Sequence, residues 1–311
     1  TKNLLKKLLN MTLNGVYHTA KIGDIIYSLP AVYLRGGTKY YKIKREGVCE
    51  YLKPLLEAQP YIGRVEYSSN GNDCELDFSN YQALYKLYLR GNLTYMHLIC
   101  AGIRAHHFPL KISKLSIKSD HLSYGNVDID LDTHRNIPIW SDEKPWLTNI
   151  EPNHVADIII NITDRYHDWK NQGSKEHDFR NFDYTLCKDY DCGFIGLDNE
   201  YDLFVDRYKF EPKRIVVKDA LETAQIIKGS KLFVGNASSA KAIAEGLKHP
   251  TLMEISKTYP DCIPMHKHGY HFISKELVEH YLNTDIPYAE FPIVEPKQVV
   301  KPKQALEGFF T

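Results

Sequence analysis

Apolar and polar positions alternate along the first half of the chain in blocks that predict strands and helices in turn. Short runs of β-branched or aromatic residues predict strands at residues 15–20, 39–44, 63–68 and 73–78. Apolar residues at helical spacing predict helices over residues 24–35 and 48–58. A longer helical region is expected at 81–105, and short segments at 113–119 and 127–131 that continue the sheet. This alternation is typical of a parallel, doubly wound sheet, so residues 1–140 are expected to form a Rossmann-like α/β domain.

The alternation restarts after residues 132–153, which are rich in proline, asparagine and charge and form the expected linker. Strands are predicted at residues 155–162, 192–195, 214–217, 231–234 and 251–255, and helices at 198–208, 219–228, 240–247 and 274–283. A second Rossmann-like domain is therefore expected over residues 150–284, facing the first across a cleft. The tail at residues 285–311 is expected to cross back over the first domain or to be partly mobile.

Local signals refine three of these elements. Pro30 is expected in or near the first turns of its helix, where proline costs least. Asp219 and Glu222 form a D-x-x-E pattern like a capping box, and Gly229 is expected just after that helix, as its C′ residue.

Residues 231–255 are the stretch around which the second half is organised. Gly235 and Asn236 end a strand with the two residue types that best tolerate positive φ, and Ser238 and Ser239 offer N-cap hydroxyls. All side chains from 235 to 240 are small or compact, so a ligand can approach the backbone, and free N–H groups at a helix start favour anions. The pattern indicates a phosphate or sugar-nucleotide site, although an ordinary tight turn between strand and helix explains the same residues.

Composition excludes some classes of partner. The 311 residues carry 39 basic and 39 acidic side chains, so no global attraction to nucleic acid or anionic membrane is expected. No apolar run is long enough for a membrane span. Residues 1–13 are basic and leucine-rich and are expected to pack on their own domain, with membrane-surface docking as the alternative. The six cysteines are scattered without zinc spacing, which favours reduced thiols and a cytoplasmic protein.

Two stretches together resemble a known family. Residues 21–34 read KIGDIIYSLPAVYL and residues 233–244 read FVGNASSAKAIA. They are similar to two motifs of the ADP-heptose:lipopolysaccharide heptosyltransferases, glycosyltransferases of family 9, in the same order along the chain. The resemblance is that of a divergent relative. It implies the GT-B fold of two Rossmann-like domains and metal-independent, inverting transfer of a hexosyl or heptosyl group from a nucleotide-diphosphate sugar to an acceptor hydroxyl.

The resemblance also implies catalytic roles. Asp24 would be the general base for the acceptor hydroxyl, although a carboxylate there also simply favours a helix start. Arg165 would contact the donor diphosphate, a role that Lys170 could also fill, and a surface ion pair is the alternative for Arg165. Thr163 could add a hydroxyl to the phosphate.

The donor would be held mainly by the second domain. Gly235, Asn236, Ala237, Ser238 and Ser239 would bind the diphosphate through backbone N–H groups and hydroxyls. Gly196, Asp198 and Glu200 would lie near the ribose, and an acidic helix start explains the two carboxylates equally well. The chain departs from the family at Asn236, often Asp there, and at Lys241 or Ala242, where the family has His.

Three histidines could suggest a metal site. His266, His268 and His271 lie close together in the sequence, but no acidic or cysteine cluster accompanies them, so neither a metal nor another cofactor is expected.

The acceptor implied by the resemblance is a lipopolysaccharide-type glycan. A hydroxymethylated base of phage DNA would instead require a basic, aromatic groove, for which the candidates are Lys39, Tyr40, Tyr41, Lys42, Lys44, Arg45 and Arg64. A non-catalytic protein that binds sugar nucleotides is the third alternative. The donor sugar, its base and the oligomeric state do not follow from the sequence.

Overall fold

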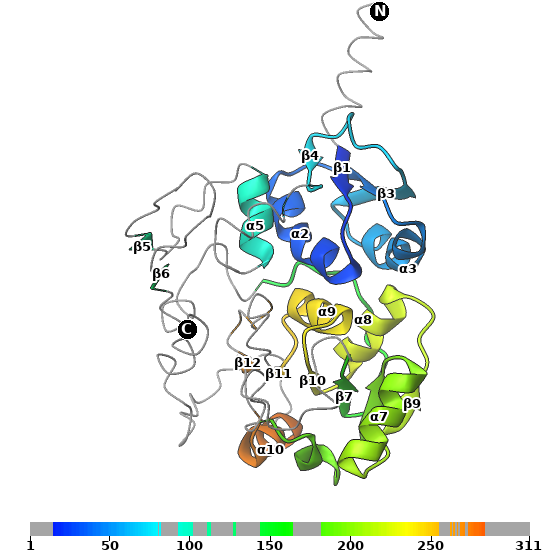
Figure 1. Cartoon of the computed structure of the whole chain (residues 1–311), viewed down its shortest axis with the longest axis vertical. Coiled ribbons are helices and arrows are strands. Elements are labelled where there is room, and N and C mark those ends of the chain that lie inside the picture. The colour runs from blue at the N-terminus through cyan, green and yellow to red at the C-terminus, as the bar shows by residue number, and fades with distance from the viewer. Residues whose placement is uncertain are drawn as a thin grey trace, which may run out of the picture.

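The computed structural model describes residues 15–79, 81, 93–101, 111–112, 127–128, 144–163, 182–254, 262, 264, 266, 268–270 and 273–283 (Figure 1). Two α/β units follow one another along this part of the chain, and in Figure 1 the first lies above the second. Each has a parallel sheet with packed helices, which confirms the predicted fold class. Residues 1–13, 132–143 and 285–311, and with them the expectations for the leucine-rich start and the tail, lie outside the described residues.

The first unit contains a parallel sheet in the order β3-β2-β1-β4 among its described residues. Its strands are β1 (Gly15–His18), β2 (Lys39–Ile43), β3 (Ile62–Tyr67) and β4 (Leu76–Asp77), and its helices are α2 (Ile22–Leu34), α3 (Glu46–Glu57) and α5 (Leu93–Cys100). The chain runs outward from β1 through β2 to β3 and then returns to the other side of β1. The switch point of the topology therefore lies between β1 and β4.

The second unit has the complete doubly wound order. In the described residues its sheet runs β12-β11-β10-β7-β8-β9 and every pair is parallel. The strands are β7 (Ile158–Asn161), β8 (Cys192–Ile195), β9 (Lys213–Ile215), β10 (Leu232–Gly235), β11 (Thr251–Met253) and β12 (Gly269–Tyr270). The helices are α7 (Asp198–Tyr208), α8 (Ala220–Gly229), α9 (Ser239–Leu247) and α10 (Lys275–Asn283), with a short 3-10 helix at Tyr184–Cys187. The switch point lies between β7 and β10.

Several local predictions are confirmed and others are wrong. Ser238 caps α9 and Asp219 caps α8, each side chain accepting a backbone N–H three residues on. Pro30 is wrong as a first-turn residue because it lies well inside α2. Gly229 is the last residue of α8 rather than its C′ residue; a Cβ there would lie 2.3 Å from the Asn153 backbone.

Two further predictions fail. The segment at residues 127–131, expected to continue the first sheet, instead contains β6 (Val127–Asp128), which pairs antiparallel with β5 (Lys111–Ile112). The other such segment, residues 113–119, lies outside the described residues. The second concerns Gly235 and Asn236, which were expected at the end of β10 because they tolerate positive φ. Positive φ is recorded at Gly36, Gly37, Asn149, Lys209 and Lys248, and neither Gly235 nor Asn236 is among them. A Cβ on Gly235 would lie 2.3 Å from the carbonyl oxygen of Asn161, so close packing of β10 on β7 excludes a side chain there.

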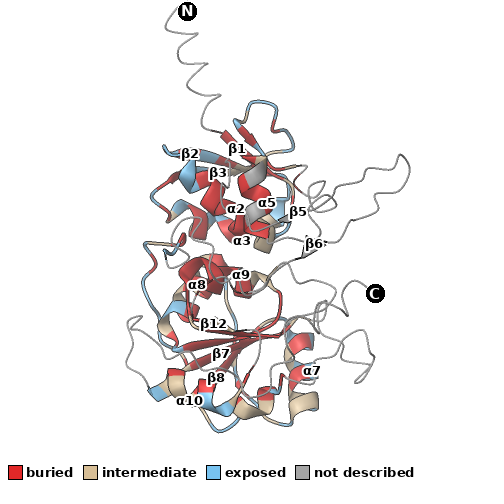
Figure 2. Cartoon of the chain, turned by 90° about the vertical axis from the view of Figure 1, so that its left-hand side faces the viewer, coloured by how far each residue is buried: buried red, intermediate tan, exposed pale blue. Residues whose placement is uncertain are grey.

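Helices pack between the two sheets. Helix α2 contacts α9, and α3 contacts α8, so one hydrophobic cluster runs through both units (Figures 1 and 2). The described part of the connecting segment adds to this contact, because the backbone N–H groups of Trp146 and Leu147 both donate to the Gly246 carbonyl on α9. The hydroxyls of Tyr51 on α3 and Thr223 on α8 form a hydrogen bond of 2.9 Å.

A buried group of charges lies in this interface. Lys241 of α9 is fully buried, and its Nζ lies 3.0 Å from both Glu245 Oε2 and the Tyr27 hydroxyl on α2. Glu245 also accepts from Lys248 Nζ at 3.2 Å. The attraction of these cations outweighs the cost of burial and lowers the pKa of Glu245. We call Tyr27, Lys241, Glu245 and Lys248 the interface charge cluster.

We first predict that Lys241→Met destabilises the protein by about 3–5 kcal/mol. The substitution leaves the Glu245 carboxylate buried with fewer cations, and breaking a buried ion pair from one side has a cost of that order. Urea unfolding at neutral pH measures it. Lys275→Met on α10 is the matched control, because this side chain is 67% exposed and its ion pair with Glu279 is worth little. Equal stability of the two variants would contradict the prediction.

Two general findings complete the fold. No helix in the described residues is long and apolar enough to cross a membrane. The structure describes all six cysteines, and none of them forms a disulfide bond.

Candidate functional site

The switch point of the second sheet brings most of the predicted donor-binding residues together. Strands β7 and β10 end side by side there, with Gly235 opposite Asn161 in the parallel register. Ligands of doubly wound sheets bind outside the carboxyl ends of the strands at such a point. The loop after β7 reaches Thr163, and the turn after β10 contains Asn236, Ala237 and Ser238. These residues therefore lie at the switch point between β7 and β10.

Thr163 and Asn236 fasten the two loops to each other. Asn236 Oδ1 accepts from the Thr163 backbone N–H at 3.0 Å, and Asn236 Nδ2 donates to the Thr163 carbonyl at 3.1 Å. The Thr163 hydroxyl donates weakly to Asn236 Oδ1 at 3.4 Å. The Asn236 side chain is thus engaged in shaping the turn, which leaves the backbone beyond it as the part that can meet a ligand.

That backbone is the start of α9. Ala237 is buried, whereas Ser238 and Ser239 are half-buried. The Ser238 hydroxyl accepts from the Lys241 N–H at 3.0 Å, so one N–H group of the first turn is capped. The other N–H groups of a first turn have no partner within their helix, and with the helix dipole they favour an anion. Nearby, Asn161 Oδ1 is buried with no hydrogen-bond partner among the described residues.

Gly196, Asp198 and Glu200 lie at the next strand end. Asn161 Nδ2 donates to the Ile195 carbonyl at the end of β8 and so joins this group to the switch point. The carboxylate of Glu200 accepts from the Leu197 N–H at 2.8 Å. Arg214 donates to the Gly196 carbonyl at 2.6 Å and to Asp198 Oδ1 at 2.9 Å. Both carboxylates therefore have protein partners, and their role toward a ribose stays a prediction.

The switch point of the first sheet holds Asp24. The chain leaves β1 at His18 and enters α2, whose first turn contains Asp24, while Tyr81 follows β4 on the other side of the crossing. Asp24 is half-buried. Burial raises the pKa of the Asp24 carboxyl to about 6, against the opposing effects of a hydrogen bond from Tyr81 and the charge of Arg45. A carboxylate with such a pKa is a stronger proton acceptor than an ordinary aspartate and is still ionised at neutral pH.

The two switch points meet at the junction of the units. A Cβ placed on Gly23 would lie 3.7 Å from the Ser238 carbonyl oxygen and 3.7 Å from Ala242 Cβ. The starts of α2 and α9 are therefore neighbours, although 215 residues separate Gly23 from Ser238 in the sequence. The predicted base and the predicted phosphate-binding turn thus come from different units and lie side by side.

The structure does not test every predicted site residue. Arg165, Lys170 and His271 lie outside the described residues. His266 and His268 are buried, and burial lowers the pKa of His266 to about 3. The described residues contain no group of three His, Cys, Asp or Glu side chains that could hold a metal ion.

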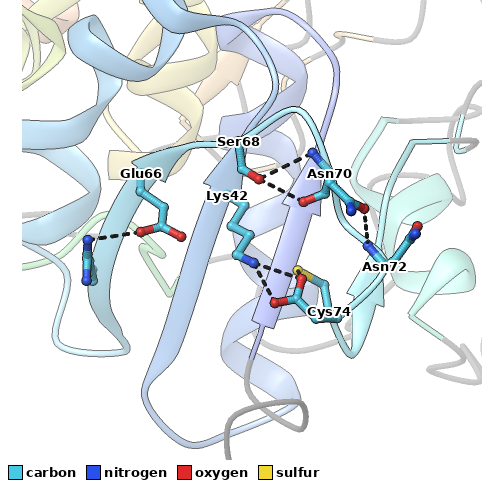
Figure 3. A network of polar contacts seen from close by, with 8 residues as sticks. Lys42, Glu66, Ser68, Asn70, Asn72 and Cys74 are labelled. Carbon is cyan, nitrogen blue, oxygen red and sulfur yellow. Dashed lines mark hydrogen bonds and ion pairs between the residues drawn. The ribbon is translucent and has the colours of Figure 1, made fainter.

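The residues considered for a DNA-binding groove are largely engaged within the first unit. Lys39 is buried in an ion pair with Glu75, and Tyr41 is fully buried against the Ser28 hydroxyl. Figure 3 shows Lys42 directed to the loop after β3, where its Nζ donates to both oxygens of Asp73 at 2.7–2.8 Å. Lys39 and Tyr41 are therefore buried away from any such groove, and Lys42 is held in an ion pair with Asp73.

Sequence reasoning missed Tyr81, Asn161 and the partners of Asp24 and Lys241. A polar residue that ends the apolar run IIIN could have pointed to Asn161. No pattern in the sequence marks Tyr81, which lies among many tyrosines and leucines and reaches Asp24 only through the sheet crossing.

No protein-family model matches the chain, and no curated protein does. Solved structures do match. Heptosyltransferase WaaC of E. coli with ADP-2-deoxy-2-fluoro heptose is 10% identical, with a TM-score of 0.41 over 87% of this chain and 98% of that chain. E. coli ADP-heptose LPS heptosyltransferase II is 13% identical, with a TM-score of 0.40 over 87% and 97%.

A third similar structure is a glycosyltransferase family 9 protein from Veillonella parvula DSM 2008. It is 13% identical, with a TM-score of 0.37 over 78% of this chain and 80% of that chain. At identities and TM-scores this low, an activity can rest only on the residues of the chain itself.

Our second prediction is that Asp24→Asn makes the protein more stable at pH 8 and not at pH 4. The pKa of Asp24 is higher in the folded chain than its ordinary value of 3.8, so the folded state binds more protons between these values. Stability then falls as pH rises through about 6, and a neutral amide avoids the loss. For a half-buried group we expect on the order of 1–2 kcal/mol at pH 8.

Urea unfolding of both proteins at pH 4 and pH 8 measures this difference. Glu46→Gln is the control, since Glu46 is exposed in the first turn of α3 and its loss removes a favourable interaction with the helix dipole. The control should therefore be slightly less stable at pH 8. Asp24→Asn with the same sign as the control would show that burial does not dominate at Asp24.

Proposed function

We propose that the chain is an inverting glycosyltransferase that uses a nucleotide-diphosphate sugar, with Asp24 as its general base. The observation that carries the proposal is the meeting of the α2 and α9 starts, which places a half-buried carboxylate beside an anion-favouring turn. A transfer reaction needs both groups at one place. A protein that only binds sugar nucleotides needs the turn but not the carboxylate with a raised pKa.

The proposed reaction proceeds in one displacement. Asp24 accepts the proton of the acceptor hydroxyl, and the hydroxyl oxygen attacks the anomeric carbon of the donor sugar. The bond from that carbon to the diphosphate oxygen breaks with its electron pair, so the nucleoside diphosphate leaves and the configuration inverts. The start of α9 stabilises the negative charge of the leaving group through its N–H groups and dipole.

The remaining roles are part of the same proposal. Gly235, Ala237, Ser238 and Ser239 contact the diphosphate, while Thr163 and Asn236 hold their turn in shape. Arg165 or Lys170 supplies further positive charge. No metal or other cofactor takes part, the acceptor is a glycan hydroxyl, and the reaction belongs to the cytoplasm. Lys39 and Tyr41 are buried and Lys42 is paired with Asp73, so these three residues give no support to a DNA acceptor.

Our third prediction concerns the donor. Ser239→Glu places a negative charge at the first residue of α9, where it favours the helix but repels a diphosphate. Binding of the nucleoside diphosphate that the native protein prefers among ADP, GDP, UDP and CDP should weaken on the order of tenfold or more. Isothermal titration calorimetry measures the dissociation constant, and the melting temperature should not fall.

Lys275→Glu is the matched control. It changes the net charge by more, at the first residue of α10, which lies at the end of the second unit away from α9 (Figure 1). It should bind the nucleotide as the native protein does. Equal binding by Ser239→Glu, or no binding of any of the four nucleotides by the native protein, would contradict the donor site.

The fourth prediction tests the base. Asp24→Asn keeps the size of the side chain and its capacity to accept a hydrogen bond from Tyr81, but an amide cannot take up the proton. Turnover should fall by about 10²–10⁴-fold, which is the usual contribution of general-base catalysis. The donor dissociation constant should barely change, because the donor is bound mainly by the second unit.

Turnover is measured in EDTA as nucleoside diphosphate released from the nucleotide sugar that the native protein uses. Asp24→Asn within threefold of the native rate would show that Asp24 only favours the helix start. Loss of activity in EDTA that Mg²⁺ or Mn²⁺ restores would overturn the metal-free reaction.

A further inference from the structure

A compact group of aromatic rings lies in the first unit, near Asp24. His18 ends β1, Phe78 and Tyr81 follow β4, and His97 lies on α5, so three separate parts of the first unit contribute. All four side chains are at most 2% exposed. We call these four residues the aromatic cluster. It lies at the crossing between β1 and β4, and α2, whose first turn contains Asp24, follows β1 there.

The hydrogen bonds of the two histidines allow one consistent neutral arrangement. His18 Nδ1 accepts from the Ala20 N–H at 3.2 Å, so the His18 proton is on Nε2. That proton is donated to His97 Nε2 at 3.0 Å, and His97 Nδ1 then donates to the Leu93 carbonyl at 2.7 Å. Burial lowers the pKa of His18 well below its usual range and that of His97 to about 4. Both rings therefore stay neutral and fixed at neutral pH.

Tyr81 joins this rigid group to Asp24. Its ring stacks on His97 with centroids 4.5 Å apart and planes at 20°, and it lies 5.3 Å from the His18 ring. Its hydroxyl forms a hydrogen bond with the Asp24 side chain. A stacked ring has little freedom to turn, so the hydroxyl is presented to the carboxylate in one direction.

We propose that Tyr81 is a positioning residue for the transfer reaction: fixed by the aromatic cluster, it holds the Asp24 carboxylate in one orientation and in its proton-accepting form. The proposal rests on the proposed function, in which Asp24 is the base. A phenol can donate to a carboxylate but leaves the second carboxylate oxygen free for the acceptor hydroxyl. Tyr81 thus acts through Asp24 and has no contact of its own with the reacting atoms.

Several groups around Asp24 affect its pKa, and Tyr81 is the uncharged one among those that favour the carboxylate. Arg45, at the start of α3, is the charged side chain that acts on Asp24. On α9, which packs on α2, the Lys241 ammonium is bound to Glu245 and Tyr27. On β1 and α5, His18 and His97 are neutral. Burial opposes the ionised carboxylate, and the Tyr81 hydrogen bond is the largest effect that favours it.

The fifth prediction is that Tyr81→Phe raises the pKa of Asp24 by about one unit or more while the fold is kept. A hydrogen bond to a charged group favours the ionised form by about that much, and phenylalanine retains the stacked ring. The carbon signal of Asp24 in protein labelled at the aspartate carboxyl, identified by its loss in Asp24→Asn, reports this pKa directly by NMR. It does so without any substrate.

Kinetics give the second readout. A shift of about one unit lowers the ionised fraction at pH 6 from roughly one half to one tenth. The ratio of turnover at pH 6 to turnover at pH 9 should therefore fall roughly fivefold, which a general loss of structure would not produce. Tyr33→Phe is the control: Tyr33 is also on α2 but is 51% exposed, and both readouts should match the native protein.

A second variant covers the case in which Tyr81→Phe does not fold. 3-Fluorotyrosine at position 81 keeps the ring and has a more acidic hydroxyl, so it should lower the pKa of Asp24. An unchanged Asp24 pKa in the variant that folds overturns the proposal, as does a raised pKa without a change in the pH dependence of turnover. If Asp24→Asn keeps the native rate, the base assignment fails instead, while the NMR titration still reports whether Tyr81 acts on Asp24.

Discussion

The packing of α2 against α9 is the contact on which the site depends. Eight of the nine residues of α9 are buried, and Ser239 at its start is half-buried. A helix covered along its length can meet a ligand only at an end. Because the end left open is the N-terminus, the place that remains accessible is also the one that favours an anion. The same packing brings the first turn of α2, with Asp24, next to it.

The interface charge cluster makes this contact specific. Apolar packing alone tolerates small changes of register, whereas Lys241 must reach both Glu245 on its own helix and the Tyr27 hydroxyl on α2. Lys248 is tied to the same carboxylate and lies over the Trp146 ring, 4.3 Å from its centroid. Buried ion pairs contribute little net stability, but a misplaced one is costly. The cluster therefore disfavours other ways of docking the two units and so preserves the distance between Asp24 and the α9 turn.

The sequence was informative where local rules decide the outcome. Alternating apolar blocks predicted both parallel sheets, and residues 192–195 and 198–208 were predicted at their observed limits. The caps at Asp219 and Ser238 follow from side chains that reach only three residues. Gly235 was correctly singled out but for the wrong reason, since a close approach of Asn161 requires it and not a positive φ. The prediction for Gly229 was wrong for a similar reason, because the backbone that approaches it belongs to Asn153, which is far away in the sequence.

The candidate site was predictable only in part for the same reason. Asp24 and the turn at residues 235–239 each belong to a local motif, so both were found. Tyr81 contacts Asp24 across 57 positions, and His18 contacts His97 across 79, and one sequence does not reveal such contacts. Lys241 was noted as a departure from the family, but its hydrogen bond to Tyr27 depends on how two separate units pack.

Asp24 shows how these long-range contacts set a chemical property. Its place at a helix start, the Arg45 charge and the Tyr81 hydroxyl all favour the carboxylate and would give an ordinary or low pKa. Burial between the units opposes them and has the larger effect, so the pKa rises to about 6. Without the favourable contacts the same burial would raise the pKa of Asp24 further, and without burial Asp24 would be a weak base. A carboxylate that is both ionised and basic near pH 7 therefore requires the docked units and the aromatic cluster together.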